Sequence, residues 1–125
     1  MHLEMEESMS EKYFGGFNDR DDIAREFLAG YRKNFKIPED FPTEEQIIFA
    51  AYEGGSYEGA AIVVYEKDGK LFEVNGSHCS CHGLEDQWSP EETSKEALGM
   101  RKLASYDYHK DTIARFHELF GGDNK

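Results

Sequence analysis

The sequence predicts an α+β domain: a three-stranded antiparallel meander with one helix before it and two helices after it, the helices lying mainly on one face. Residues 46–75 hold three strand-like runs separated by turn residues, and stretches with helical spacing of apolar residues lie on both sides of them. The 125 residues fit a single domain. We expect this domain to cover residues 13–125, after a flexible acidic tail at residues 1–12.

The first helix is expected over residues 19–33. Asn18 precedes it as an N-cap, and three aspartates follow in the first turn, where the helix dipole favours negative charge. Apolar residues at helical spacing would form its buried side, namely Ile23, Ala24, Phe27, Leu28 and Tyr31.

The three strands are expected at residues 46–53, 57–66 and 70–75. The middle run, Ala60-Ala61-Ile62-Val63-Val64-Tyr65, is rich in β-branched residues. Asp68-Gly69 predicts a two-residue hairpin turn between the second and third strands.

Two further helices are expected at residues 90–104 and 108–120. Ser89, Pro90 and Glu92 form the pattern of an N-cap, a first-turn proline and a capping box. Gly121-Gly122 would end the last helix. The apolar residues expected to point inward are Ala97, Leu98, Met100 and Leu103 in one helix and Ile113, Phe116 and Phe120 in the other.

The negative charge of the chain is concentrated in its middle. The formal net charge is −12, and residues 37–94 hold thirteen acidic residues against Lys67 and Lys70, a net charge of −11. Such a field repels nucleic-acid phosphates and anionic membranes and attracts basic surfaces, although acidic surfaces also simply favour solubility. No apolar run reaches the ~20 residues of a membrane span, and the N-terminus lacks the features of a secretion signal. We expect a cytoplasmic protein.

One loop contains four residues of the types that bind soft metals: His78, Cys79, Cys81 and His82. Zinc sites usually have two to four residues between paired cysteines and a second ligand pair far along the chain. Here one residue separates the cysteines, and His109 and His117 are the candidate distant ligands. A Cys–His nucleophilic pair is another interpretation, but no protease-like pattern surrounds it. We expect small buried cysteines beside hydrogen-bonding histidines, with no metal or cofactor.

The remaining polar residues give no catalytic pattern. Three carboxylate pairs are typical of solvated surfaces or helix starts: Glu44/Glu45, Glu85/Asp86 and Glu91/Glu92. No phosphate-binding glycine loop, calcium loop or dinucleotide fingerprint is present. Trp88 is either a core anchor or a contact for a partner. The sequence therefore predicts a protein that is not an enzyme.

Part of the chain resembles a known family through a series of short motifs. These are SYEG at 56–59, KDGKLFEVNGSHCSC at 67–81, GLE at 83–85, QW at 87–88 and PEET at 90–93. With them, residues 46–100 resemble a family of short phage and prophage proteins with no established activity. The family has Tyr before the glycine where this chain has His82, so this histidine is not a ligand shared across the family. The resemblance implies a phage-type accessory protein, a class rich in small inhibitors of host machinery or host defence.

Charge and resemblance together predict a small acidic accessory protein in the cytoplasm of a host cell. It would bind the basic surface of a host nucleic-acid-binding or defence protein and inhibit it by nucleic-acid mimicry. Neither nucleic acid nor a membrane is an expected partner. The alternative is a zinc-stabilised domain, or an enzyme, organised by the Cys–His loop. The expected partner-binding residues are Glu39, Asp40, Glu44, Glu45, Glu53, Glu58 and Trp88.

Overall fold

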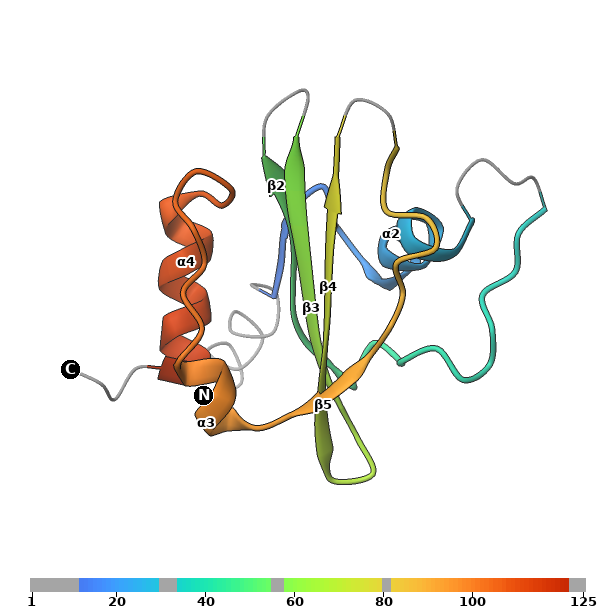
Figure 1. Cartoon of the computed structure of the whole chain (residues 1–125). Helices are drawn as coiled ribbons and strands as arrows, with labels where there is room; N and C mark the ends of the chain where they lie inside the picture. Colours follow the sequence, from blue (N-terminus) through green and yellow to red (C-terminus); the bar gives the residue numbers. More distant parts are fainter. Residues whose placement is uncertain (1–11, 30–33, 55–57, 80–81, 122–125) are drawn as a thin grey trace, which may run out of the picture.

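The centre of the protein is a mixed five-stranded sheet in the order β1–β2–β3–β4–β5 (Figure 1). The computed structural model describes residues 12–29, 34–54, 58–79 and 82–121. The strands are β1 (Tyr13–Gly15), β2 (Ile47–Gly54), β3 (Gly59–Lys67), β4 (Lys70–His78) and β5 (Glu91–Thr93). β1 runs parallel to β2, and the other neighbouring strands are antiparallel. The predicted α+β class is confirmed, and the predicted meander forms the three central strands.

Two short edge strands make the prediction of a three-stranded sheet wrong. β1 has three residues, too few to show the alternation that identifies a strand in a sequence. β5, expected to be the first turn of a helix, instead pairs with residues 71–73 of β4. The helix begins after Ser94 and not after Ser89, because the Ser94 hydroxyl accepts a hydrogen bond from the Ala97 N–H at 3.0 Å.

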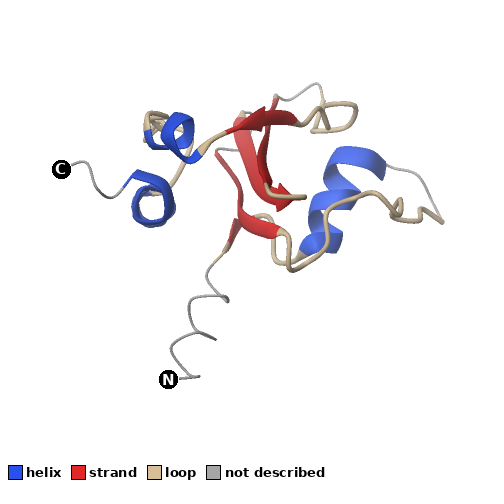
Figure 2. Ribbon diagram, turned by 90° about the horizontal axis from the view of Figure 1, so that it is seen from below, coloured by secondary structure: helices blue, strands red, loops and turns tan. Residues whose placement is uncertain are grey.

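Helices cover both faces of the sheet, so the prediction that they lie mainly on one face is wrong (Figures 1 and 2). On one face lies α2 (Arg20–Ala24), continued by the π-helical turn η1 (Arg25–Ala29). On the other face lie α3 (Lys95–Gly99) and α4 (Lys110–Phe116), with α4 continued by the π-helical turn η2 (His117–Gly121). The view along the sheet in Figure 2 shows the three layers.

The middle strand explains this arrangement. Five consecutive residues of β3 are buried. Ala61, Val63 and Tyr65 belong to the cluster under α2, whereas Ile62 and Val64 belong to the cluster under α3 and α4. A strand that is apolar on both sides needs a covering layer on each side. The unbroken apolar run in the sequence was therefore the signal for two helical layers.

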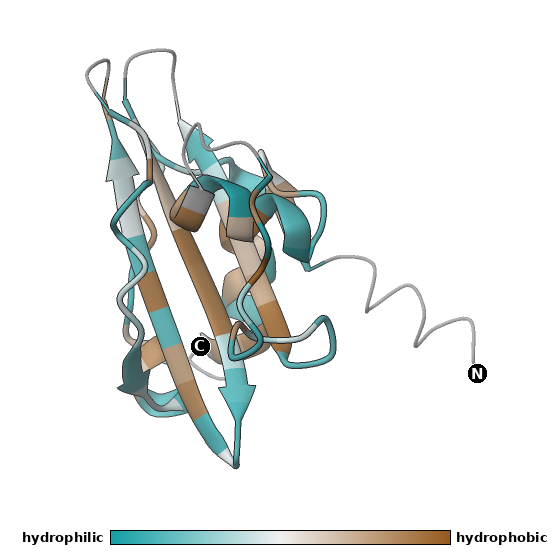
Figure 3. Ribbon diagram, turned by 90° about the vertical axis from the view of Figure 1, so that its right-hand side faces the viewer, coloured by the Kyte–Doolittle hydropathy of each residue, from teal (hydrophilic) through white to brown (hydrophobic). Residues whose placement is uncertain are grey.

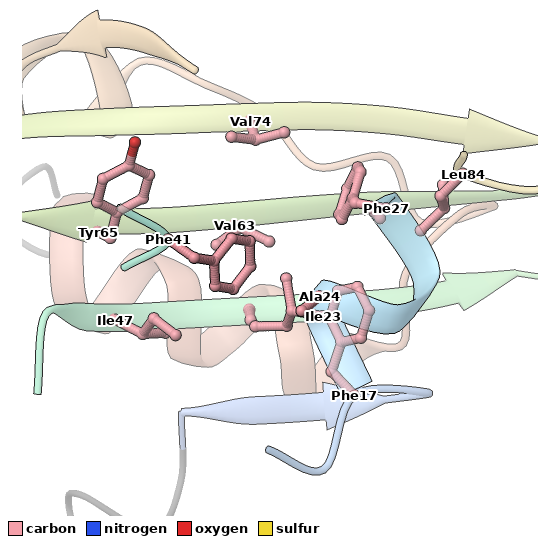
Figure 4. Packing of buried hydrophobic residues seen from close by; sticks show 12 residues of the cluster. Phe17, Ile23, Ala24, Phe27, Phe41, Ile47, Val63, Tyr65, Val74 and Leu84 are labelled. Carbon is pink, nitrogen blue, oxygen red and sulfur yellow. The ribbon is translucent and has the colours of Figure 1, made fainter. Parts of the chain in front are cut away.

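The cluster on the α2 face joins helix and sheet through large side chains. Phe17 and Phe27 pack with Val63 and Val74, and each of these four side chains is at most 1% exposed (Figure 4). Hydrophobic residues run along the middle of the strands, and the strand ends are hydrophilic (Figure 3). The sheet ends are therefore the places where polar groups can face a partner.

The cluster on the opposite face is centred on Phe49 of β2. Its ring centroid lies 5.3 Å from that of Phe116 and 6.5 Å from that of Phe120. Ile113 packs against the same cluster, so the predicted inward side of the last helix is confirmed.

The cap of the first predicted helix and the length of the second differ from the prediction. Asp19, not Asn18, caps α2, because its carboxylate accepts the Asp22 N–H at 2.9 Å. Residues 30–33, the predicted end of this helix, lie outside the described residues. In the region predicted as helix 90–104, α3 covers only Lys95–Gly99. Leu98 is buried and Leu103 packs against the same cluster, as predicted, but Ala97 and Met100 are exposed.

Candidate partner-binding surface

The segment between η1 and β2 is held firmly although it forms neither helix nor strand. We call residues 34–46 the connector. Phe41 in its middle is 3% exposed, and its ring centroid lies 4.7 Å from that of Trp88. Arg20 of α2 donates a hydrogen bond from Nε to the Pro42 carbonyl at 2.5 Å. These contacts tie the connector to the α2 face of the sheet.

Three of the expected partner-binding residues project from the connector without a structural role. Glu39, Asp40 and Glu45 are exposed. Burial raises the pKa of the Tyr65 hydroxyl, and the nearby Asp40 carboxylate raises it further, so Asp40 lies beside the end of β3. The three carboxylates are therefore available to a partner at the end of the sheet where β2 begins.

Glu44 is exposed as well, but the fold already uses it. Its Oε1 accepts a hydrogen bond from the Tyr13 hydroxyl at 2.7 Å, and its Oε2 lies 3.5 Å from the Lys12 ammonium group. Burial and then the bond to Glu44 raise the pKa of Tyr13. Lys12, predicted to be the last residue of a flexible tail, also donates hydrogen bonds to the carbonyl groups of Glu44 and Ile47. The rest of that tail, residues 1–11, lies outside the described residues.

A second acidic segment lies beside the connector. The chain leading into β5 passes over the α2 face, where Trp88 meets Phe41. Neither residues 37–66 nor residues 71–94 contain a lysine or arginine. We call the exposed carboxylates at this end of the α2 face the acidic surface: Glu39, Asp40, Glu44 and Glu45 of the connector and Glu92 of β5, which pairs with Phe72, whose ring stacks on Tyr65 beside Asp40. Glu85 lies towards the other end of the sheet, near Glu26 and Tyr52, and Glu91 lies near Arg101 on the other face.

Glu53 and Glu58 lie at the opposite end of the sheet. β2 has eight residues, so its two ends are about 25 Å apart. The Glu53 carboxylate accepts hydrogen bonds from the His109 N–H at 2.8 Å and from the hydroxyl of the buried Thr112 at 2.7 Å. Glu58 is exposed beside Gly59. The seven expected partner-binding residues therefore do not lie on one surface, and Glu53 holds α4 to the sheet.

Glu73 is a second structural carboxylate. Its side chain is 3% exposed and accepts hydrogen bonds from Arg101 Nε at 2.8 Å and Asn75 Nδ2 at 2.9 Å. Arg101 Nη2 lies 2.7 Å from the same oxygen. Burial raises the pKa of Glu73, but the bonds from Arg101 and Asn75 lower it more, so its pKa lies below the usual value. This ion pair ties the loop after α3 to β4.

Trp88 joins three elements of the α2 face. Its ring centroid lies 5.2 Å from Phe27, 4.7 Å from Phe41 and 6.1 Å from Tyr65. It is partly buried and packs against the hydrophobic cluster there. These contacts support the core-anchor interpretation, and they make Trp88 the residue that positions the two acidic segments.

The Cys–His loop brings two of its three described residues close together, Cys79 and His82. The His78 ring lies on the α2 face, 5.6 Å from the ring of Tyr52. Cys79 follows in an extended chain, which sends successive side chains to opposite sides. The Cys79 N–H donates to the His82 carbonyl at 3.1 Å, so the pairing of these two residues is made by main-chain atoms. Cys79 is partly exposed, which corrects the prediction that it is buried.

His82 is exposed, and one of its ring nitrogens is engaged. Nδ1 lies 2.9 Å from the Gly83 carbonyl, which can only accept, so Nδ1 is the donor. This bond, and then the proximity of Cys79, raises the pKa of His82. Within the described ranges, no group of three or more His, Cys, Asp or Glu residues is placed to hold a metal ion. Cys81 lies outside those ranges.

The sequence did not identify Glu92 as part of a binding surface. The absence of lysine and arginine around it was visible. Its position beside the connector was not visible, because it depends on the pairing of β5 with β4 and on the contact between Phe41 and Trp88, which are far apart in the chain.

The chain matches no model of a protein family, no curated protein and no solved structure. Among the helices of the described part, none is both long and apolar enough to cross a membrane.

Proposed function

We propose that this protein is a non-enzymatic binding protein whose acidic surface docks on the basic, nucleic-acid-binding surface of a host protein and blocks it. One observation carries the proposal. Two acidic segments, neither with a lysine or arginine between their carboxylates, are held side by side by the Phe41–Trp88 contact. The resemblance to phage and prophage proteins supports a host protein as the target.

The physical basis is electrostatic complementarity on a preorganised surface. Carboxylates held at defined positions can occupy the places of phosphates on a basic surface, and their field raises the association rate. Phe41, Pro42 and Trp88 hold the backbone of both segments before binding. Less conformational entropy is then lost when the complex forms.

The test is affinity capture from host lysate with three forms of the full chain. One is unmodified, and one carries Glu39→Lys and Glu45→Lys on the acidic surface. The third carries Glu96→Lys and Glu118→Lys, two exposed glutamates of α3 and η2 on the opposite face. Both variants change the net charge equally. Glu44 is left in place because it bonds to Tyr13.

The proposal expects a basic nucleic-acid-binding protein that the unmodified chain and the α3/η2 variant capture and that the Glu39/Glu45 variant loses. Affinity for the captured protein should fall steeply above ~0.15 M salt, where the screening length is about 8 Å. An affinity that is unchanged by salt, or equal loss in both variants, would exclude the acidic surface as the docking site.

The protein itself should not bind duplex DNA. The field of the middle segment opposes phosphate, so no electrophoretic shift is expected at physiological salt. A shift under these conditions would contradict the mimicry proposal directly.

A further inference from the structure

The loop between α3 and α4 exposes large hydrophobic side chains. Met100 is 79% exposed and Tyr106 is 86% exposed, and both lie in residues 100–109. Tyrosine is one of the residue types that are enriched at binding hot spots. The loop lies on the α4 side of the sheet, whereas the acidic surface lies on the α2 side (Figure 1).

Tyr106 borders a hollow of about 530 Å³. Its lining consists of Gly54, at the end of β2, and residues 105–110. The hollow thus lies where the α3–α4 loop meets the upper end of the sheet in Figure 1. Its volume is large enough to receive the head of a long side chain.

The loop that carries Tyr106 is held in position. The Ala104 carbonyl accepts the N–H groups of Asp107 and Tyr108, both at 3.0 Å. Tyr108 is 7% exposed and belongs to the cluster under α4, and the His109 N–H donates to Glu53. Tyr106 is therefore presented to solvent from a turn that is anchored on both sides.

The charges around the hollow favour a cation. Asp107 lines it, and the Glu53 carboxylate lies at its edge, where it accepts the N–H of the lining residue His109. Lys110 contributes the opposing charge, and His109 is a further titratable lining group. Two carboxylates against one ammonium group give a negative local field.

We propose that this hollow binds an arginine side chain of a protein partner. A guanidinium group is planar, so it can stack on the Tyr106 ring and donate hydrogen bonds to the Asp107 carboxylate at the same time. A lysine ammonium group can make one of these interactions well, but it lacks the planar face. The site is separate from the acidic surface and does not depend on its proposed role.

The test uses the full chain and three small probes: the N-acetyl methylamides of arginine, lysine and glutamate. Amide chemical shifts are followed by NMR at 0.15 M salt. The arginine probe is expected to shift the amides of Gly54 and residues 105–110 in a saturable way, more strongly than the lysine probe, and the glutamate probe is expected to leave them unchanged. Equal shifts from arginine and glutamate, or none from arginine, would overturn the proposal.

Three variants sharpen the result. Tyr106→Ala is expected to weaken arginine binding about two- to fivefold, as the loss of one exposed cation–π contact implies. Asp107→Asn should weaken it as well, and Tyr106→Phe should keep it. Undiminished binding by Tyr106→Ala would contradict the assignment. The Glu39→Lys, Glu45→Lys protein should retain the shifts at the hollow, so a failure of the acidic-surface proposal is distinguishable from a failure here.

Discussion

Two pairs of carboxylates within residues 37–94 have different roles: one pair stabilises the fold and the other faces solvent. Glu53 and Glu73 accept hydrogen bonds from groups on the α3–α4 side, and each connects that layer to the sheet. Glu39 and Glu45 are exposed on the connector. All four contribute equally to the net charge, but only the second pair can meet a partner without loss of a structural bond.

This difference shows why a count of acidic residues in the sequence overstates the charge that is available to a partner. A buried carboxylate must be compensated by charged or hydrogen-bonding groups, and its charge is then neutralised locally. Arg101 neutralises Glu73 in this way. Glu39 and Glu45 keep their charge for a partner, because no such internal use engages them.

The Glu73–Arg101 pair should give the largest effect on stability. Arg101→Leu leaves the Glu73 carboxylate buried without its main partner. We expect a loss of about 2–3 kcal/mol in the free energy of unfolding, measured by urea denaturation. Lys102→Leu, at the exposed neighbouring position, is the matched control and should stay within about 0.5 kcal/mol. A small loss from Arg101→Leu would show that Glu73, like the exposed carboxylates, contributes little to the stability of the fold.

Glu53→Ala should give the second largest loss of stability. Glu53→Ala removes two hydrogen bonds and leaves the buried Thr112 hydroxyl without this acceptor. The expected loss is about 1–2 kcal/mol, and Glu53→Gln should recover part of it because the amide oxygen can still accept. Glu58→Ala, at an exposed glutamate of the same sheet end, should be nearly neutral. Equal effects at Glu53 and Glu58 would remove the distinction between them.

Acid should abolish the contribution of Glu73. Its folded pKa lies below the usual value, so its stabilisation is fully present above the unfolded-state pKa of ~4.3 and is lost as the pH falls through the folded pKa. The difference in unfolding free energy between the unmodified protein and Glu73→Gln should be constant from pH 7 to about pH 5 and shrink below that. A difference that does not change down to pH 2 would rule out a lowered pKa.

The smallest effect is expected at the Cys–His loop. Cys79 is partly exposed, so changing both Cys79 and Cys81 to Ser should cost less than about 1 kcal/mol. Chelator treatment of the unmodified protein should leave its melting temperature unchanged. Stoichiometric zinc in the purified protein, with a large chelator-induced loss of stability, would favour the zinc-stabilised alternative, since structural zinc contributes directly to folding.

Local sequence was sufficient for the centre of the fold. The β-branched run of β3 and the Asp68-Gly69 turn predict strands and a hairpin from residues adjacent in the chain, and both are present. The three-residue strands β1 and β5 could not be found in this way. Each depends on pairing with β2 or β4, and so short a segment carries no periodicity of its own.

The same distinction between local sequence and tertiary structure applies to the candidate binding surface. The sequence by itself determined that negative charge accumulates in residues 37–94 and that Glu39, Asp40 and Glu45 lie within it. Only the tertiary structure decided which carboxylates remain available. Glu53 meets its partners His109 and Thr112, and Glu73 meets Arg101, only when α3, α4 and their connecting loop pack on the sheet. Electrostatic interactions act through space, so the role of each carboxylate is set by neighbours that the order of residues does not specify.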